Sequence, residues 1–118
     1  TLSNLILILI MVETGGHPDP NNAVGDNGLA FGILQLHAGY VQDAAQHAGK
    51  DWVHEDAFDP VKAVLIFRSY MDRYATAERL GHPVTIESIA KIHNGGPNGF
   101  KKHSTEPYWE KVKLAINR

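Results

Sequence analysis

The chain has 118 residues, of which 43% are hydrophobic and 20% are charged, and its formal net charge is -2 at pH 7. This length predicts one domain, residues 1–118, with a core of its own, and the hydrophobic content excludes a disordered chain. The small negative charge gives no basis for binding nucleic acid, and the absence of cysteine excludes disulfides, thiolate metal sites and a cysteine nucleophile, so packing alone must stabilise the fold.

The first predicted element is an N-terminal helix over residues 2–14, which the pair Gly15-Gly16 ends. Its centre, residues 5–12, is an unbroken apolar run, so we expect a helix surrounded by protein, although a buried strand has the same pattern. This run is much shorter than the roughly 20 residues that cross a membrane, and no basic residue precedes it as in a signal peptide. We therefore expect no membrane span.

A loop with a small hairpin is expected next, because residues 15–30 are rich in glycine, proline, asparagine and aspartate. Apolar positions three and four residues apart then predict further helices, the longest with Asp59 as its cap and Pro60 at its first position. The expected fold class is therefore mainly α (α+β), a compact bundle of about five helices with a Gly-rich loop or small hairpin after the first. The later helices are expected at residues 38–47 (ended by Gly49), 60–79, from Thr85 to the run 93–99, and from a cap at Ser104 or Thr105 to Ile116.

Glu13 stands directly after the apolar run and is the first catalytic candidate. A carboxylic acid at the edge of an apolar helix loses solvation, which favours the protonated form that can donate to a glycosidic oxygen. Alternatively, Glu13 only marks the solvent-exposed end of the helix, where a negative charge meets the unfavourable end of the helix dipole. The sequence alone leaves both interpretations open.

Asp26 is the second candidate, on the loop that adjoins the first helix. Two carboxylates, one leaving a buried element and one on a neighbouring loop, are what acid-catalysed glycoside cleavage requires. A turn-forming aspartate is also what the local segment of residues 24–28 needs, so a turn is the stronger interpretation of Asp26 taken alone. The case for a catalytic Asp26 rests on the need of Glu13 for a second carboxylate.

Four further residues are candidates for substrate binding: Gln35, Tyr40, His93 and Asn94. The amide of Gln35 can hold a sugar hydroxyl or an N-acetyl group, or it can satisfy loop backbone. Tyr40 can stack on a sugar face, although aromatic residues at helical spacing more often belong to the core. His93 and Asn94 precede two glycines, where a helix C-cap explains the asparagine but explains the histidine less well.

The seven histidines do not predict a metal site. None forms a His-Glu-x-x-His unit or a close ligand pair, so we expect neither a metal nor a cofactor. A Gly-x-Ser-x-Gly element is also missing, which argues against serine chemistry.

The motifs of the chain resemble those of the invertebrate-type (destabilase) lysozymes, and more closely those of their cysteine-free bacterial relatives. They stand in the family's order and span nearly the whole chain. The most specific is the His-Asn-Gly-Gly-Pro run at 93–97, with Tyr108-Trp109 after it, whereas the Glu-x-Gly and Gly-x-x-Gln elements occur across the wider lysozyme-like superfamily. The matching segments are residues 12–16, 25–28, 31–35, 92–99, 104–105 and 108–109.

The resemblance implies a mainly helical lysozyme fold that cleaves the β-1,4 bond between N-acetylmuramic acid and N-acetylglucosamine in peptidoglycan. It places Glu13 on the family's general acid and Asp26 on or within one residue of its second catalytic carboxylate. It places Gln35 and His93 on motif positions near the substrate cleft. In the family's retaining mechanism Glu13 protonates the leaving oxygen, Asp26 attacks or stabilises the anomeric carbon, and Glu13 then activates water.

The chain departs from the family pattern in two respects. Phe31 and Phe100 stand where disulfide-rich members carry cysteine, so apolar packing must replace the covalent ties and we expect lower heat resistance. The slightly acidic charge, where many wall-degrading lysozymes are cationic, argues against rapid killing of whole bacteria.

Three functions follow as hypotheses. The leading one is an antimicrobial, secreted or periplasmic lysozyme that hydrolyses peptidoglycan glycan strands as a monomer without a cofactor. The first alternative is a lytic transglycosylase that uses Glu13 alone and forms a 1,6-anhydro sugar. The second is an inactive wall-binding module with a lysozyme shape, in which Glu13→Gln changes no measurable property.

Overall fold

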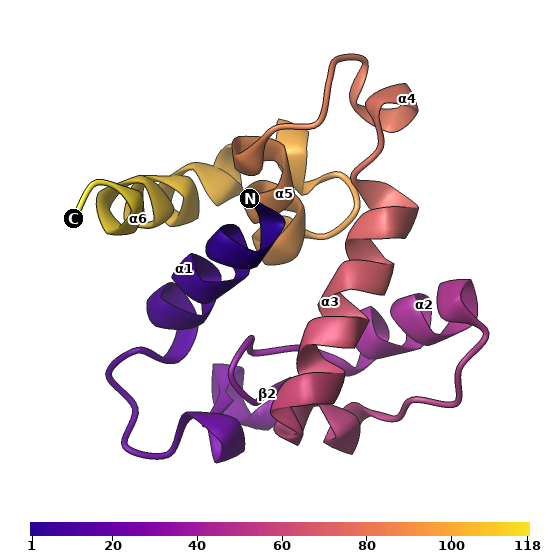
Figure 1. Cartoon of the computed structure of the whole chain (residues 1–118), viewed down its shortest axis with the longest axis vertical. Helices are drawn as coiled ribbons and strands as arrows, with labels where there is room; N and C mark the ends of the chain where they lie inside the picture. Colours follow the sequence, from indigo (N-terminus) through magenta and orange to yellow (C-terminus); the bar gives the residue numbers. More distant parts are fainter. The chain divides into compact units, whose positions relative to one another are not determined.

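The computed structural model describes residues 1–118, which divide into two compact units. One unit comprises Thr1–Val12 with Met71–Arg118, and the other comprises Glu13–Tyr70. The fold is mainly helical with one short hairpin, as the sequence predicts, and no helix has the length and apolar character that a membrane crossing requires. The α-helices are α1 (Leu2–Thr14), α2 (Ala38–Ala48), α3 (Pro60–Tyr74), α4 (Ala77–Leu80), α5 (Ile86–Gly95) and α6 (Glu106–Ile116) (Figure 1).

Helix α1 has the predicted bounds but is not surrounded by protein. Leu5 and Leu9 are buried on one face, whereas Leu7 and Met11 are 63% and 50% exposed. Residues four positions apart lie on the same face of a helix, so the buried pair and the exposed pair mark two different faces. The expectation of a helix buried on every side is therefore wrong, because an unbroken apolar run does not show which of its faces will be packed.

The predicted hairpin is present in the unit Glu13–Tyr70. Strand β1 (Val24–Gly25) pairs antiparallel with β2 (Ala30–Phe31), with Val24 opposite Phe31 and Gly25 opposite Ala30. The turn between the strands is a short 3₁₀ helix, η2 (Asp26–Gly28), and another, η1 (Pro20–Asn22), precedes β1. Asp26 thus lies at the tip of the hairpin.

Phe31 occupies one of the positions where cysteine was expected in relatives, and it is packed between aromatic rings. Its ring stacks on His54 at 3.6 Å and on Phe58 at 4.5 Å between centroids. His54 and Phe58 bound a 3₁₀ helix, η3 (His54–Phe58), in a segment predicted only as a surface crossing. Aromatic stacking therefore ties the hairpin to η3 without a covalent bond.

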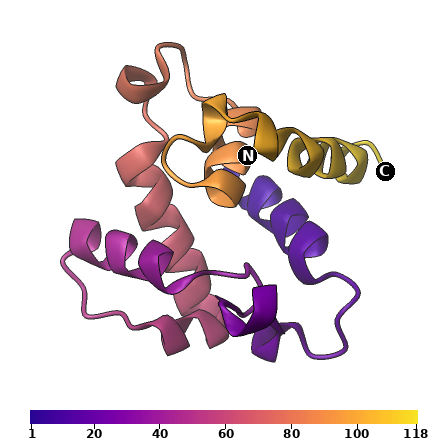
Figure 2. The ribbon, with the colours of Figure 1, turned by 180° about the vertical axis from the view of Figure 1, so that it is seen from behind.

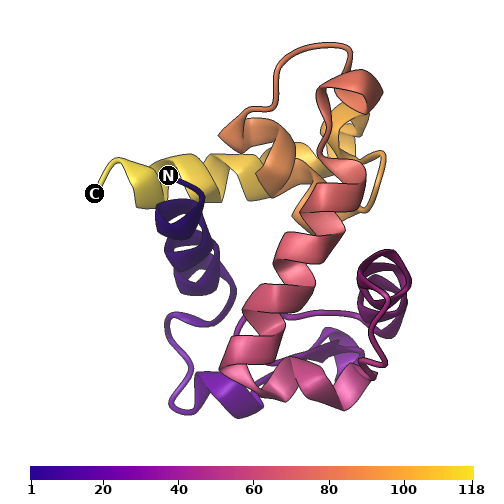
Figure 3. The same cartoon turned by 45° about the vertical axis from the view of Figure 1, so that its right-hand side comes forward.

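Helices α2 and α3 lie side by side in this unit (Figure 3). The ring of Tyr40 stacks on that of Tyr70 at 3.7 Å, and Ser69 Oγ donates a 2.7 Å hydrogen bond to the carbonyl of Ala44. As predicted, α2 ends at Gly49, which has φ +65°, a value that glycine adopts without strain. Asp59 also caps α3 as predicted, since its Oδ1 accepts hydrogen bonds from the backbone N–H groups of residues 61 and 62.

The helix predicted to run to residue 79 ends earlier, at Tyr74. A separate helix, α4, begins after Thr76, whose backbone is extended and whose Oγ1 accepts a hydrogen bond from the N–H of Arg79. A threonine at an N-cap satisfies the free N–H groups of a new helix, which makes a break at this point stable. The prediction of one continuous helix is therefore wrong, and the chain has six α-helices.

Helix α5 begins after the predicted cap, because Thr85 and Ser88 exchange side-chain to backbone hydrogen bonds. It continues through residues 93–95, and Gly96, the C-cap that follows, has φ +86°. The segment from α5 to α6, orange in Figure 2, contains two 3₁₀ helices, η4 (Gly99–Lys101) and η5 (His103–Thr105). Thr105 stands at the predicted N-cap position of α6, but its side chain forms no capping hydrogen bond there. Its hydroxyl is instead directed at the carbonyls of Gly99 and Lys102.

Candidate active site

Glu13 is the penultimate residue of α1 and is half-buried. The next residue, Thr14, is 5% exposed, and its hydroxyl donates a 3.0 Å hydrogen bond to the carbonyl of Ile33. Ile33 follows β2, so this bond fastens the end of α1 to the hairpin region. Glu13 therefore leaves the helix at a fixed point beside the loop that carries Gln35.

The hairpin and the loop after it hold three residues in an unusual backbone conformation. Asp26, Asn27 and Gln35 have φ values of +51°, +58° and +54°, and they are the non-glycine residues of the chain with positive φ. Aspartate and asparagine tolerate this left-handed region, whereas glutamine seldom adopts it. Such conformations persist only where surrounding contacts impose them, and they are concentrated at functional sites.

The contacts of Gln35 explain its conformation. Its Nε2 donates to the carbonyls of Gly32 at 2.8 Å and Ala23 at 3.3 Å, and its Oε1 occupies the space where a Cβ of residue 25 would lie. A side chain at position 25 would therefore displace the amide of Gln35 from this position. Of the two roles predicted for the amide, the geometry favours satisfying loop backbone, and contact with substrate stays a prediction.

Asp26 forms a side-chain contact that the sequence did not indicate. His37 Nε2 lies 2.8 Å from Asp26 Oδ2, and the two side chains are 49% and 69% exposed. His37 is the residue before α2, so the pair connects the hairpin turn to the start of that helix. No three histidine, aspartate or glutamate side chains gather as metal ligands would.

Tyr40 lies in the first turn of α2 and is half-buried. One face of its ring is covered by Tyr70, with an angle of 7° between the two planes. This is the core packing that the sequence offered as the alternative to sugar stacking, and a role of Tyr40 in binding substrate stays a prediction.

His93 and Asn94 lie at the end of α5, in the unit that contains Met71–Arg118, whereas the other predicted site residues belong to the unit Glu13–Tyr70. His93 is 8% exposed, and the centroid of its ring is 6.4 Å from that of Tyr108. Asn94 is exposed. The buried imidazole is thus packed against the Tyr-Trp element of the same motif.

Arg79 fixes the loop that follows His93 and Asn94. Its Nη1 donates to the carbonyls of Tyr74 at 2.8 Å and Pro97 at 2.9 Å, and its Nη2 donates to Asn98 Oδ1 at 3.1 Å. The guanidinium also lies over the ring of Phe100 at 5.8 Å. The guanidinium of Arg79 therefore joins α4 to the end of α3 and to the loop after α5.

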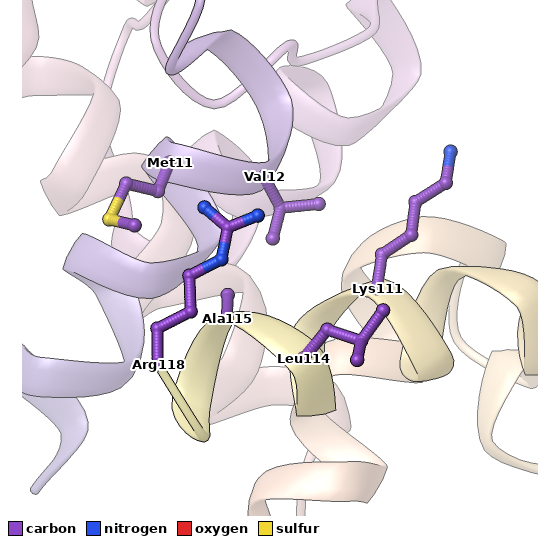
Figure 4. Close-up of a pocket in the computed structure, with 6 residues that line it drawn as sticks. All are labelled: Met11, Val12, Lys111, Leu114, Ala115 and Arg118. Atoms are coloured by element: carbon purple, nitrogen blue, oxygen red, sulfur yellow. The ribbon is translucent and has the colours of Figure 1, made fainter.

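A cavity of about 250 Å³ lies between α1 and α6 (Figure 4). None of the predicted site residues lines it. Its lining residues are Met11, Val12, Lys111, Leu114, Ala115 and Arg118.

Sequence reasoning missed Thr14, His37 and Arg79. Each acts on a residue between 11 and 19 positions away in the sequence, through hydrogen bonds that leave no local pattern. Only Thr14 carried any signal, because it stands within the Val-Glu-Thr-Gly-Gly element at the end of α1.

Comparison with known proteins decides the family. The profile of the Destabilase family matches residues 11–115. The chain belongs to this family. The match includes Glu13 and Asp26 and leaves out only the first turns of α1 and the last three residues, so it confirms the resemblance seen in the sequence.

Lysozymes of bivalve molluscs are similar to this chain over most of its length. An invertebrate-type lysozyme of Ruditapes philippinarum is 35% identical over an alignment of 107 residues that covers 89% of this chain and 74% of that protein. A lysozyme of Meretrix lusoria is 36% identical over 85 residues, which are 72% of this chain and 66% of that protein.

Solved structures of this family agree with the fold. The crystal structure of Tapes japonica lysozyme matches with a TM-score of 0.74 and 32% identity, covering 92% of this chain and 85% of that one. Meretrix lusoria lysozyme, in a structure with Aeromonas hydrophila PliI, matches with a TM-score of 0.74 and 31% identity over 93% of this chain and 86% of that one. These matches confirm the mainly helical lysozyme-like fold class.

Proposed function

We propose that the chain is a lysozyme that hydrolyses the β-1,4 bond between N-acetylmuramic acid and N-acetylglucosamine, with Glu13 as general acid and Asp26 as the second carboxylate. The glycoside hydrolase activity follows from family membership and from relatives named lysozyme at 35% and 36% identity over most of the chain. The observation that carries the proposal is that the family match covers residues 11–115, from the end of α1 through the His-Asn-Gly-Gly motif.

The proposed reaction has two steps. In the first, the carboxyl of Glu13 donates its proton to the glycosidic oxygen as the bond to the anomeric carbon breaks, and Asp26 attacks or stabilises that carbon. In the second, the carboxylate of Glu13 takes a proton from a water molecule as the water oxygen bonds to the anomeric carbon, and any bond between that carbon and Asp26 breaks, which restores Asp26 as a carboxylate. Overall, each cleavage consumes one water molecule and forms one new reducing end.

Features within the unit Glu13–Tyr70 support these roles. Glu13 is half-buried at a helix end that the Thr14–Ile33 hydrogen bond holds beside the hairpin. Asp26 lies in a left-handed turn at the hairpin tip, held by His37. Held groups favour catalysis because they lose little freedom when the substrate binds.

The proposed partner is the peptidoglycan glycan strand, and the proposed site of action is therefore outside the cytoplasm, as a secreted or periplasmic enzyme. The net charge of -2 offers no long-range attraction to an anionic wall. Binding must then depend on short-range contacts with the sugar chain, so we propose that the enzyme acts more readily on isolated cell walls than on whole bacteria.

Analysis of the products tests the proposal. Purified peptidoglycan is digested with wild type, and hydrolysis predicts products with free reducing ends. Products that end in a 1,6-anhydro sugar contradict it, because a transglycosylase transfers the sugar to its own hydroxyl in place of water.

The role of Asp26 is tested in the same assay with Asp26→Asn, using Asp51→Asn at an exposed position without a bonding partner as the matched control. The proposal predicts a loss of at least about tenfold for Asp26→Asn and none for Asp51→Asn. If the two variants have equal rates, Asp26 takes no part in the mechanism.

A further inference from the structure

His37 is held in a way that leaves its ring available to Asp26. The residue occupies the N-cap position of α2, but its side chain forms no capping hydrogen bond there. Its backbone carbonyl instead accepts the first bond of the helix, from the N–H of Val41 at 3.2 Å. The backbone of His37 is thus fixed by the helix, while its imidazole points to the hairpin and contacts Asp26 Oδ2 at 2.8 Å.

Asp26 depends on this one contact. Its carboxylate has no other hydrogen-bond partner, and its side chain is 69% exposed. The adjacent Asn27 is also left-handed, so the turn fixes the backbone of Asp26. Only contacts of the side chain can restrict the rotation of its carboxylate. Without an imidazole beside it, the carboxylate of Asp26 is free to rotate in water.

We propose that His37 is a positioning residue for Asp26, which rests on the catalytic role proposed for Asp26 above. The Nε2–H of His37 holds Oδ2 and leaves Oδ1 to face the anomeric carbon. Either a neutral ring with its proton on Nε2 or an imidazolium supplies the required donor. His37 does not itself touch the reacting atoms.

The geometry separates a positioning role from a structural one. Contacts between exposed side chains contribute little to stability, so we expect loss of His37 to leave the fold intact. A catalytic group displaced by about 1 Å, however, can reduce the rate about 100-fold. A large loss of rate with little loss of thermal stability is therefore the expected signature.

The test measures kcat, KM and the thermal midpoint for His37→Leu and His37→Gln on soluble peptidoglycan fragments. His37→Leu removes the donor, and we expect kcat to fall at least about tenfold with KM and the thermal midpoint little changed. His37→Gln keeps an N–H donor near the position of Nε2 and is expected to recover most of kcat. His103→Leu, at an exposed position in the other unit, is the matched control.

A double variant shows whether His37 acts through Asp26. When both residues serve one function, His37→Leu lowers the rate of wild type but not that of Asp26→Asn. Equal losses in both backgrounds, or no loss in wild type, overturn the positioning role while the function of Asp26 stands. If the Asp26→Asn variant is fully active, Asp26 has no catalytic role. That result contradicts the proposed function of Asp26 and, with it, the positioning role of His37.

Discussion

The hydroxyl of Thr14 and the carbonyl of Ile33 form a 3.0 Å hydrogen bond that joins the last residue of α1 to the segment after β2. Both residues are buried, so water cannot replace either partner. The bond sets where α1 ends relative to the hairpin, and Glu13 is the residue immediately before it. Placement of the proposed general acid therefore depends on a neighbouring hydroxyl.

Thr14→Val removes this hydroxyl while keeping the shape of the side chain. The buried carbonyl of Ile33 then lacks its partner, and we expect the free energy of unfolding to fall by about 1–3 kcal/mol, measured by urea denaturation. We also expect a lower kcat, because the end of α1 is no longer fastened. Thr14→Ser keeps the donor and should retain both properties; a Thr14→Val protein as stable as wild type argues that the bond has no structural role.

Phe31→Ala tests whether aromatic packing replaces the expected covalent ties. The ring stacks on both His54 and Phe58, so its removal opens a cavity between the hairpin and η3. Core Phe→Ala substitutions reduce stability by about 3–5 kcal/mol, and we expect a value near the lower limit because Phe31 is half-buried. Thermal unfolding measures the change, and a midpoint within a degree or so of wild type would show that the stack contributes nothing. The expected heat resistance relative to disulfide-rich relatives stays a prediction.

Arg79→Lys tests the fixing of the His-Asn-Gly-Gly loop. A lysine ammonium cannot reproduce a planar guanidinium that donates to Tyr74, Pro97 and Asn98 at once. We expect faster amide hydrogen exchange across residues 94–99 and lower activity, with the helices still protected. Arg118→Lys, whose arginine has no bonding partner, is the control, and unchanged exchange in the Arg79 variant contradicts the assignment.

Stability should depend on pH through Lys91, which is buried and contacts Glu87 at 2.6 Å and Glu106 at 2.7 Å. Burial lowers the pKa of Lys91, but the two carboxylates outweigh this and raise its pKa above 10.5. The hydrogen bond from Lys91 in turn lowers the pKa of Glu106 below 4.5. A lowered carboxyl pKa stabilises the fold above the unfolded value, and this stabilisation is lost as pH falls through the folded value.

The Lys91 contribution has the opposite sign: it is complete below pH 10.5 and is lost as pH rises through the raised pKa. We therefore expect the difference in unfolding free energy between wild type and Glu106→Gln to be constant near neutral pH and to shrink well below pH 4.5. Urea unfolding across this range measures it. A difference that stays the same in acid shows that the pair does not titrate with folding.

Local signals in the sequence predicted the parts of the fold that depend on neighbouring residues. Asp59 and Thr85 were identified as caps because cap and helix lie within a few positions, and Gly49 ended α2 for the same reason. The break at Thr76 was missed because apolar positions continue at helical spacing across it.

Only the part of the candidate site that lies in sequence motifs was predicted. Glu13 and Asp26 stand in motifs that can be read in order along the chain, so they were found as candidates. His37 was assessed only as a possible metal ligand, because no periodic or capping pattern links it to a residue 11 positions earlier. Contacts made by folding, such as that pair, have no local signature.

Glu13 is proposed to supply the proton that breaks the glycosidic bond. This role is tested most directly by the rate at which wild type and Glu13→Gln release reducing ends from purified peptidoglycan, with Glu55→Gln at an exposed position as control. We predict that Glu13→Gln is folded and at least about 100-fold slower, since general acids contribute about 10² to 10⁴ in rate, and that Glu55→Gln matches wild type. A folded Glu13→Gln protein that releases reducing ends at the wild-type rate would contradict the mechanism.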